Sequence, residues 1–303
     1  MTEAHEPCGV LLIDKPAGMT SHDVVGKVRR LYNTRKVGHT GTLDPMATGV
    51  LVVLIGRAAK AAEYLTTHQK SYLATLRLGM TTDTEDVTGA VLTTAEAIPD
   101  AAAVQAAAAA LEGEIEQVPP MYSALKVGGQ KLVDLARRGV EIERKSRPVT
   151  IHSLVCTPRE DGDYTLDVTC SSGTYIRTLC ADIGKALGCG GVMAALRRTA
   201  TGGFTLADCT TLTALEEEDL AQRTARLIPI EALFADLPAV GLPAFFEKLC
   251  RSGCEIYQAK IKTAHPLGAR LRLCDENGAF FALGEVKDYE SGSAIKAIKH
   301  FDV

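Results

Sequence analysis

The chain has 303 residues and a net charge of −4, with 46% hydrophobic and 23% charged residues. This composition is typical of a folded soluble protein and excludes collagen-like, coiled-coil and intrinsically disordered classes. The charge argues against sequence-blind adhesion to nucleic acid, but an RNA partner stays open because only the docking face needs to be basic.

Neither a membrane span nor an export signal is expected. The longest apolar run, residues 49–55, is far shorter than the roughly 20 residues that cross a bilayer. The N-terminal sequence MTEAHEPCGV lacks a basic region followed by an apolar region, so it does not read as a secretory signal. We therefore expect a cytoplasmic protein.

The first predicted elements are a strand and a helix. GVLLID (9–14) reads as a short buried strand, and the turn sequence after it ends at Ser21, the expected N-cap of the helix. Between residues 23 and 32 the apolar residues recur at helical spacing. The opposite face of this helix carries Lys27, Arg29 and Arg30. A solvated face explains these cations better than a contact with nucleic acid.

A long loop at residues 33–49 follows, rich in Gly, Thr and Pro, and it leads into the buried strand VLVVLI (50–55). A loop of this length inside a compact domain is uncommon unless it is functional. The elements expected next are a short Ala-rich helix (58–65), an alternating strand (70–79), the acidic loop TTDTEDVTG (81–89) and a helix from about 99 to 112.

The rest of the chain mixes strands and helices without regular βαβ alternation. A Pro/Gly-framed segment (119–129) precedes a short helix (131–139), strands at about 148–157 and 164–171, and a helix (174–188) with a Gly C-cap signal. We predict an α/β protein of the α+β type: a mixed, largely antiparallel sheet with packed helices and long active-site loops in residues 1–237, and a small all-β appendix in residues 238–303.

The cysteines and the motifs give no sign of a metal or a cofactor. The nine cysteines are odd in number and never spaced C-x-x-C, which suits reduced thiols rather than a disulfide framework. Cys250 and Cys254 with His265 lack a fourth ligand at suitable spacing for zinc. Motifs for nucleotide phosphates, zinc hydrolases and serine hydrolases are missing as well. We expect neither a metal nor a cofactor.

The densest polar cluster is HTGTLDP (39–45). Gly38 and Gly41 let its backbone turn tightly or approach a ligand closely. Asp44 stands directly before Pro45, which pushes its backbone into an extended conformation. From spacing alone, such an Asp-Pro step is most often a turn initiator.

The segment GHTGTLDPMATGVLV (38–52) resembles the catalytic motif of the TruB branch of pseudouridine synthases, the bacterial tRNA pseudouridine-55 synthases. Five further segments in family order support the resemblance between about residues 9 and 205: LLIDKPAGMTS, KSYLATLRLGMTTDTEDVTG, PPMYSALKVGG, CSSGTYIRTLCADIG and LRRTATGGF. The chain departs from the family at Val133-Asp134, where a Tyr-Glu pair is common, which puts one tRNA-facing contact in doubt.

The resemblance implies roles for the residues around the reacting nucleoside. Asp44 would be the catalytic carboxylate acting at the anomeric carbon of the target uridine, and Arg177 would pair with it. Tyr72 would stack on the uracil, and Tyr175 would line the same pocket.

Four more residues receive supporting roles by resemblance. His39 would occupy the space that the target base leaves, and Leu196 would contact the flipped nucleotide. Lys15 and Pro16 would support the pocket structurally. The C-terminal piece resembles a shortened, β-barrel-like RNA-binding domain of the PUA type.

The implied reaction breaks the C1'–N1 bond, turns the uracil and joins C1' to C5, so it needs neither redox chemistry nor phosphate energy. The carboxylate either attacks the sugar or stabilises positive charge on it. The expected partner is the T-arm of tRNA, with no obligatory protein partner, and the protein is expected to be a monomer. Three alternatives stay open: a guide-RNA-directed enzyme acting on ribosomal RNA, a non-catalytic RNA-binding protein, and a nucleoside glycosidase that releases free uracil.

Overall fold

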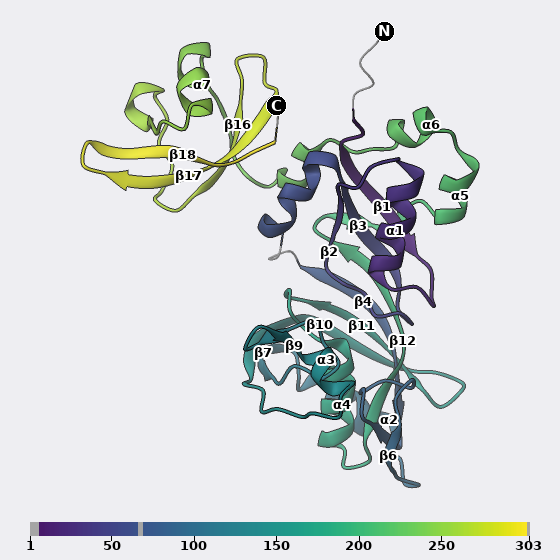
Figure 1. Ribbon diagram of the computed structural model, residues 1–303. Coiled ribbons are helices and arrows are strands. Elements are labelled where there is room, and N and C mark those ends of the chain that lie inside the picture. Colours follow the sequence, from purple (N-terminus) through teal and green to yellow (C-terminus); the bar gives the residue numbers. More distant parts are fainter. Residues whose placement is uncertain (1–5, 66–68, 302–303) are drawn as a thin grey trace.

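The computed structural model describes residues 6–65 and 69–301, and two sheets organise this part of the chain (Figure 1). The larger sheet has nine strands in the order β1-β3-β12-β4-β11-β10-β7, with β2 paired to β3 and β13 paired to β12. These strands are β1 (Gly9–Lys15), β2 (Val37–Thr40), β3 (Thr48–Ile55), β4 (Lys70–Leu78), β7 (Gly113–Gln117), β10 (Arg147–Pro158), β11 (Tyr164–Cys170), β12 (Gly191–Thr201) and β13 (Phe204–Thr205). The predicted mixed sheet is confirmed.

The contact between β3 and β12 is the parallel pairing in this sheet, and it joins two antiparallel halves. At this junction Gly49 has φ +102°, and a Cβ on it would lie 2.1 Å from the carbonyl oxygen of Arg198. Only glycine allows this approach, because a side chain would collide with the backbone of β12. The register also places Arg198 opposite Tyr72 on β4.

Helix α1 (Ser21–Leu31) packs Val24, Val25 and Val28 against β1 and β3. The prediction that Ser21 is its N-cap is wrong, because the cap is Thr20. The hydroxyl of Thr20 accepts a hydrogen bond from the backbone N–H of Asp23, and the Asp23 carboxylate accepts one from the backbone N–H of Thr20. This reciprocal capping box fixes the start of the helix one residue earlier.

Two cations on the polar face of α1 contact other residues of the protein. Lys27 forms an ion pair with Glu216 at 2.9 Å. Arg29 donates a hydrogen bond to the carbonyl oxygen of Val37 at 3.1 Å, and Arg30 is exposed. Lys27 and Arg29 therefore have partners within the protein, and the expectation that this face is solvated rather than bound to nucleic acid stays a prediction.

The other half of the large sheet is covered by α2 (Ala101–Ala109) and α4 (Ile176–Ala186), which share a core with β4, β10, β11 and β12. Gly188, with φ +72°, follows the end of α4, as the C-cap signal predicts. The remaining short elements are η1 (Gly56–Tyr64), β5 (Met80–Thr82), β6 (Val91–Thr94), β8 (Lys126–Val127), β9 (Gln130–Lys131), α3 (Leu132–Ala136), η2 (Leu206–Asp208), α5 (Leu212–Glu217), α6 (Leu220–Ala225) and η3 (Ile230–Phe234).

Several sequence predictions differ from these elements. The Ala-rich segment expected as a short helix at 58–65 is a 3-10 helix, η1, that begins two residues earlier. The loop expected at 33–49 contains the strand β2, which pairs with β3. The strands β7 and β12 were not predicted at all.

A second sheet, of five strands in the order β14-β16-β17-β18-β15, curls into a half-barrel at the C-terminal end (Figure 1, yellow). Its strands are β14 (Ala239–Gly241), β15 (Ile256–Tyr257), β16 (Arg270–Cys274), β17 (Phe280–Tyr289) and β18 (Gly292–His300). The expectation of an all-β appendix is wrong in one respect, because the helix α7 (Ala244–Arg251) packs Cys250 into the core of this sheet, and the 3-10 helix η4 (Gln258–Lys260) follows β15.

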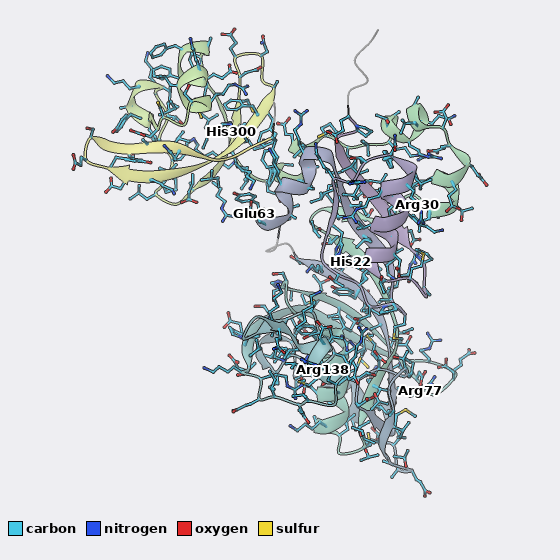
Figure 2. All side chains as sticks on the ribbon, in the orientation of Figure 1. His22, Arg30, Glu63, Arg77, Arg138 and His300 are labelled. Carbon is cyan, nitrogen blue, oxygen red and sulfur yellow. The ribbon has the colours of Figure 1, made fainter. Side chains whose placement is uncertain are left out.

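The two sheets meet through an aromatic cluster of Phe234, Phe280 and Phe301, whose ring centroids lie 5.5 to 5.9 Å apart. Glu63 lies on the side of η1 that faces the second sheet (Figure 2) and forms an ion pair with Lys299. Phe301 belongs to the same buried cluster as residues of β1 and β3, so the two sheets share buried side chains. The expected division into domains 1–237 and 238–303 stays a prediction.

None of the helices in residues 6–65 and 69–301 is both long enough and apolar enough to cross a bilayer.

Candidate active site

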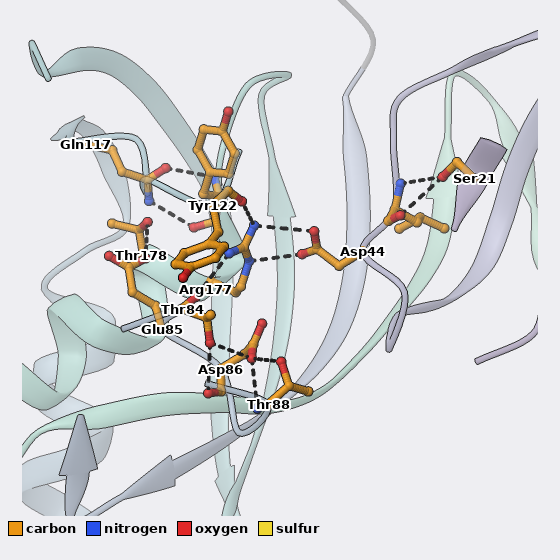
Figure 3. Close-up of polar contacts among 12 residues, drawn as sticks. Ser21, Asp44, Thr84, Glu85, Asp86, Thr88, Gln117, Tyr122, Arg177 and Thr178 are labelled. Atoms are coloured by element: carbon orange, nitrogen blue, oxygen red, sulfur yellow. Dashed lines mark hydrogen bonds and ion pairs between the residues drawn. The ribbon is translucent and has the colours of Figure 1, made fainter. Parts of the chain in front are cut away.

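A carboxylate and a guanidinium face each other where the two halves of the large sheet meet (Figure 3). Nε of Arg177 lies 3.0 Å from Oδ2 of Asp44, and its Nη2 donates to Oδ1 at 3.3 Å. The Asp44 side chain is 33% exposed, whereas that of Arg177 is 6% exposed. The pair is bidentate, so the guanidinium fixes the plane of the carboxylate as well as its position.

Asp44 is placed by a loop that is tied to neighbouring backbone on both sides. The hydroxyl of Ser21 accepts a hydrogen bond from the N–H of Leu43 at 2.9 Å and lies 3.2 Å from its carbonyl oxygen (Figure 3). On the other side, Nζ of Lys15 donates to the carbonyl oxygen of Pro45 at 3.2 Å. Asp44 is therefore flanked by two anchored residues.

Arg177 lies in the first turn of α4, and its other donors are directed at backbone carbonyls. Nη1 donates to the carbonyl of Thr84 at 3.0 Å, and Nη2 donates to that of Tyr122 at 2.8 Å. The carboxylate of Asp86 holds the Thr84 turn by accepting hydrogen bonds from the hydroxyl of Thr84 and the backbone N–H of Thr88. The acidic loop thus positions the guanidinium.

The start of α4 is fixed by a single amide side chain. Oε1 of Gln117 accepts from the backbone N–H of Tyr175 at 2.7 Å, and its Nε2 donates to the carbonyl of Tyr175 at 3.1 Å (Figure 3). The guanidinium of Arg147 lies 5.1 Å from the centre of the Tyr175 ring, within the range of a cation–π contact. Tyr175 is thereby held in position ahead of Arg177.

Burial and charge act in opposite directions on Asp44. Burial raises the pKa of its carboxyl above the ordinary 3.8, and the Arg177 guanidinium lowers it, while the charge of Asp86 raises it again. The net direction is upward, so the guanidinium offsets only part of the cost of burying the charge. The bidentate pair is nevertheless one that an ionised carboxylate makes, because both of its oxygens accept.

A cavity of about 390 Å³ opens in front of this pair. Asp44, Tyr72, Tyr175, Arg177 and Leu196 all line it, so five of the residues singled out from the sequence come together there. Tyr72 is buried, and burial raises the pKa of its hydroxyl. It therefore stays neutral at neutral pH and offers an aromatic face within reach of a planar ligand.

His39 lies in an adjoining cavity of about 290 Å³ rather than in the Asp44 cavity. Its ring packs edge-on against His22, with centroids 5.5 Å apart. Burial lowers the pKa of His39, and within the described part of the chain its buried Nδ1 has no hydrogen-bond partner. The two cavities share the rim residues Gly41, Thr42, Lys70 and Gly173.

Lys15 and Pro16 lie behind the loop and line neither of these two cavities. Nζ of the buried Lys15 donates to the carbonyls of Pro16, Met19 and Pro45. Burial lowers the pKa of Lys15 to about 8. Its contacts are those of a structural support.

Sequence reasoning did not single out several residues that hold the site. The fully buried Arg198 donates to the carbonyls of Val50 and Gly41 at 2.7 and 2.9 Å, and it ties the loop to β12. It lies inside LRRTATGGF, two positions after Leu196, so the sequence resemblance covers its segment without assigning it a role. Ser21, which holds Leu43, was expected only as a helix cap, and Lys70, which lines both cavities, was not expected at the site.

Among the described residues, no group of three or more His, Cys, Asp or Glu side chains is arranged to hold a metal ion. The cluster considered from the sequence, Cys250 and Cys254 with His265, is therefore not assembled.

Comparison with known proteins gives matches over most of the chain. The family model described as the N-terminal domain of TruB family pseudouridylate synthase matches residues 29–176, and that of the tRNA pseudouridylate synthase B C-terminal domain matches residues 177–235. The tRNA pseudouridine synthase B of Aromatoleum aromaticum is 47% identical over 91% of this chain and 88% of its own length. That of Clostridium kluyveri is 44% identical over 93% and 96%.

Solved structures show the same fold. A chain in the crystal structure of a Cbf5-Nop10-Gar1 complex superposes with a TM-score of 0.70 and 26% identity, covering 99% of this chain and 87% of that one. A chain of an archaeal box H/ACA Nop10-Cbf5 complex gives a TM-score of 0.71 at 25% identity, covering 100% and 88%.

Proposed function

Because the chain belongs to the TruB family of pseudouridylate synthases, we propose that it isomerises uridine 55 in the T-loop of tRNA to pseudouridine. The observation that carries the proposal is the bidentate pair of Asp44 and Arg177 at a cavity lined by two tyrosines. This arrangement presents one oriented carboxylate to a sugar and aromatic faces to a base.

The substrate base has to leave the folded RNA loop to reach this cavity. Extrusion costs a few kcal/mol, and stacking on an aromatic ring returns about 1 to 3 kcal/mol. Tyr72 supplies that ring from the central strand β4, and Tyr175 and Leu196 complete the wall. Binding energy thus replaces the contacts that the uridine gives up.

Asp44 then acts at C1' of the ribose. Its carboxylate either forms a bond to C1' as the C1'–N1 bond breaks, or stabilises the positive charge that develops on the sugar. The detached uracil turns while it stays in the cavity, and C5 bonds to C1'; where Asp44 has formed a bond to C1', that bond breaks in this step. The proton on C5 is then lost and N1 takes up a proton, so the product is an isomer of the substrate. The enclosing side chains keep water away from C1' during the time when hydrolysis would compete.

Sequence identity favours a reaction on tRNA over a guide-RNA-directed reaction on ribosomal RNA. The relatives named tRNA pseudouridine synthase B are 44 to 50% identical to this chain, whereas the matching chains in the two complexes that contain Cbf5 are 25 and 26% identical. We therefore propose a cytoplasmic monomer that modifies the T-arm without a protein partner.

The proposal is tested with a T-stem-loop transcript and purified protein, with chelator present and no added nucleotide. Wild type should convert the uridine at position 55, detected by chemical labelling of pseudouridine. The Asp44→Asn variant should bind the same RNA and form no product, because the amide neither attacks C1' nor carries a charge to stabilise it. Asp167→Asn, at an exposed position of β11, is the matched control and should retain wild-type turnover.

Three results would count against it. Turnover of Asp44→Asn near that of wild type removes the assigned role of the carboxylate. Release of free uracil instead of pseudouridine identifies a glycosidase. Binding without any product in the wild-type protein identifies a non-catalytic RNA-binding protein.

A further inference from the structure

The boundary between the two cavities contains a cation that the protein itself does not neutralise. Lys70 is the first residue of β4 and lines both the Asp44 cavity and the His39 cavity. Its side chain is half-buried. Within residues 6–65 and 69–301, its ammonium has neither a hydrogen bond nor an ion pair in this structure.

A neighbouring charge at Lys70 has the same sign. Gly41 lies between the two cations: a Cβ built on it would be 3.2 Å from Nη1 of Arg198 and 3.7 Å from Nζ of Lys70. Burial and the charge of Arg198 both lower the pKa of Lys70. Arg198 in turn bonds to neutral carbonyls of Val50 and Gly41. This edge of the site therefore carries positive charge without a contacting carboxylate among the described residues.

Partly buried cations are normally paired, because leaving water without a counter-charge is costly. The Asp44 side of the cavity follows this rule, since the buried Arg177 is paired with the carboxylate there. The Lys70 side does not follow it. A site with such an imbalance is suited to an anion that arrives with the substrate.

A nucleotide strand supplies such an anion at this place. A ribose against Asp44 carries one phosphate on its 3' oxygen and one on its 5' oxygen, so a phosphate must leave the cavity across its rim. Gly41 and Gly173 on that rim have no side chains to obstruct a backbone. A lysine binds phosphate well as a compact point charge.

We propose that Lys70 binds a phosphate adjacent to the extruded nucleotide, and so fixes the ribose against Asp44. The inference rests on the proposed function and adds a substrate-binding residue to it. Neutralisation by the phosphate removes the repulsion between Lys70 and Arg198, so RNA binding also stabilises the loop at Gly41 that Arg198 anchors.

The first experiment measures the affinity of the catalytically silent Asp44→Asn protein for the T-stem-loop at several salt concentrations. Adding Lys70→Met to the Asp44→Asn protein should weaken RNA binding about tenfold. It should also reduce the slope of log Kd against log salt concentration by about one, the contribution of one phosphate contact. Lys70→Arg should restore most of the affinity, because it keeps the charge. Lys185→Met, an exposed lysine at the far end of α4 that lines neither cavity, should change neither quantity.

The second experiment locates the phosphate. Neutral methylphosphonate linkages are placed singly on the 5' and 3' sides of the target uridine. One of the two methylphosphonate linkages should weaken RNA binding about tenfold in the Asp44→Asn protein, which keeps Lys70. The same linkage should leave binding almost unchanged in the protein that also carries Lys70→Met. In the otherwise wild-type enzyme, Lys70→Met should raise KM more than it lowers kcat.

Unchanged affinity and salt slope in Lys70→Met would overturn the assignment to Lys70, and so would equal effects of both methylphosphonates in the two proteins. A structural role through packing on Gly41 predicts lower thermal stability with an unchanged salt slope, which also overturns it. Failure of the proposed function is recognised separately, because the wild-type protein would then form no pseudouridine.

Discussion

The charge state of Asp44 depends on its burial and on neighbouring charges. Burial and the charge of Asp86 raise its pKa, and Arg177 lowers it. The net shift is upward. The reason is desolvation: the carboxylate loses water on its buried side, and one partner does not replace all of it.

The balance predicts how activity responds to pH. The ionised carboxylate is the active form, so activity is present above the pKa of Asp44 and is lost as the pH falls through it. Arg177→Met removes the opposite charge and should move this acid limb of kcat/KM to higher pH by about 1 to 3 units. Rate measurements from pH 4 to pH 9 on the T-stem-loop would show the shift.

Asp86→Asn supplies the control of opposite sign. It removes a negative charge that raises the pKa of Asp44, and the amide oxygen can still accept the hydrogen bonds from Thr84 and Thr88. Its acid limb should therefore move to lower pH. If the acid limbs of kcat/KM lie at the same pH in Arg177→Met, Asp86→Asn and wild type, the acid limb does not report the ionisation of Asp44.

Individual residues also mark where sequence reasoning stops. Thr20 and Ser21 are adjacent residues of types that both favour the N-cap position, and only the bonds to Asp23 show that Thr20 is the cap. Ser21 is then free to hold Leu43. Arg198 was not predicted to be buried, because an arginine in a sequence reads as a surface residue unless its carbonyl partners are known.

At the scale of elements, long and strongly patterned segments were predictable and short edge segments were not. The strands β1, β3, β4, β10 and β11 and the helices α1, α2 and α4 lie close to their expected ranges. Strand β7 is five residues long with glutamates on its exposed face, and β12 contains register shifts that break its alternation. Helix α7 follows Pro243 and has eight residues. Such a short helical pattern directly after a proline is difficult to distinguish from a turn in the sequence.

The crossing of β3 and β12 gives a prediction about stability. Gly49→Ala places a Cβ against the backbone of β12 at a positive φ, so the two halves of the sheet must separate. We expect a loss of about 3 to 5 kcal/mol in the free energy of unfolding, measured by urea denaturation.

Gly162→Ala separates the cost of the positive φ from the cost of the close approach to a neighbouring strand. Gly162 also has a positive φ, +86°, but a Cβ there meets no atom within 4 Å. Its variant should lose only about 1 to 2 kcal/mol, the cost of a left-handed backbone. Equal losses at the two positions would show that the close approach at Gly49 contributes nothing.

For the molecule as a whole, the sequence predicted two units, and the structure shows how closely they are joined. Leu283 and Phe301 from the C-terminal sheet lie in the same buried cluster as Val10 and Leu54 from the large sheet. The ion pair of Arg272 with Glu231 at 2.7 Å crosses between the same parts. No sequence pattern gives this docking, because the buried cluster joins residues more than 200 positions apart, such as Val10 and Leu283.

The shared cluster predicts that residues 1–237 and 238–303 unfold together. Phe301→Ala leaves a cavity between the sheets and should cost about 3 to 5 kcal/mol, whereas Phe245→Ala, at a side chain that is 68% exposed, should cost little. Calorimetry of both variants and wild type should give one transition each, displaced to lower temperature only in Phe301→Ala. Two transitions in the wild-type protein, with Phe301→Ala lowering one of them, would instead show that the C-terminal sheet is an independent domain, because a cooperative unit has no means of losing stability in one half alone.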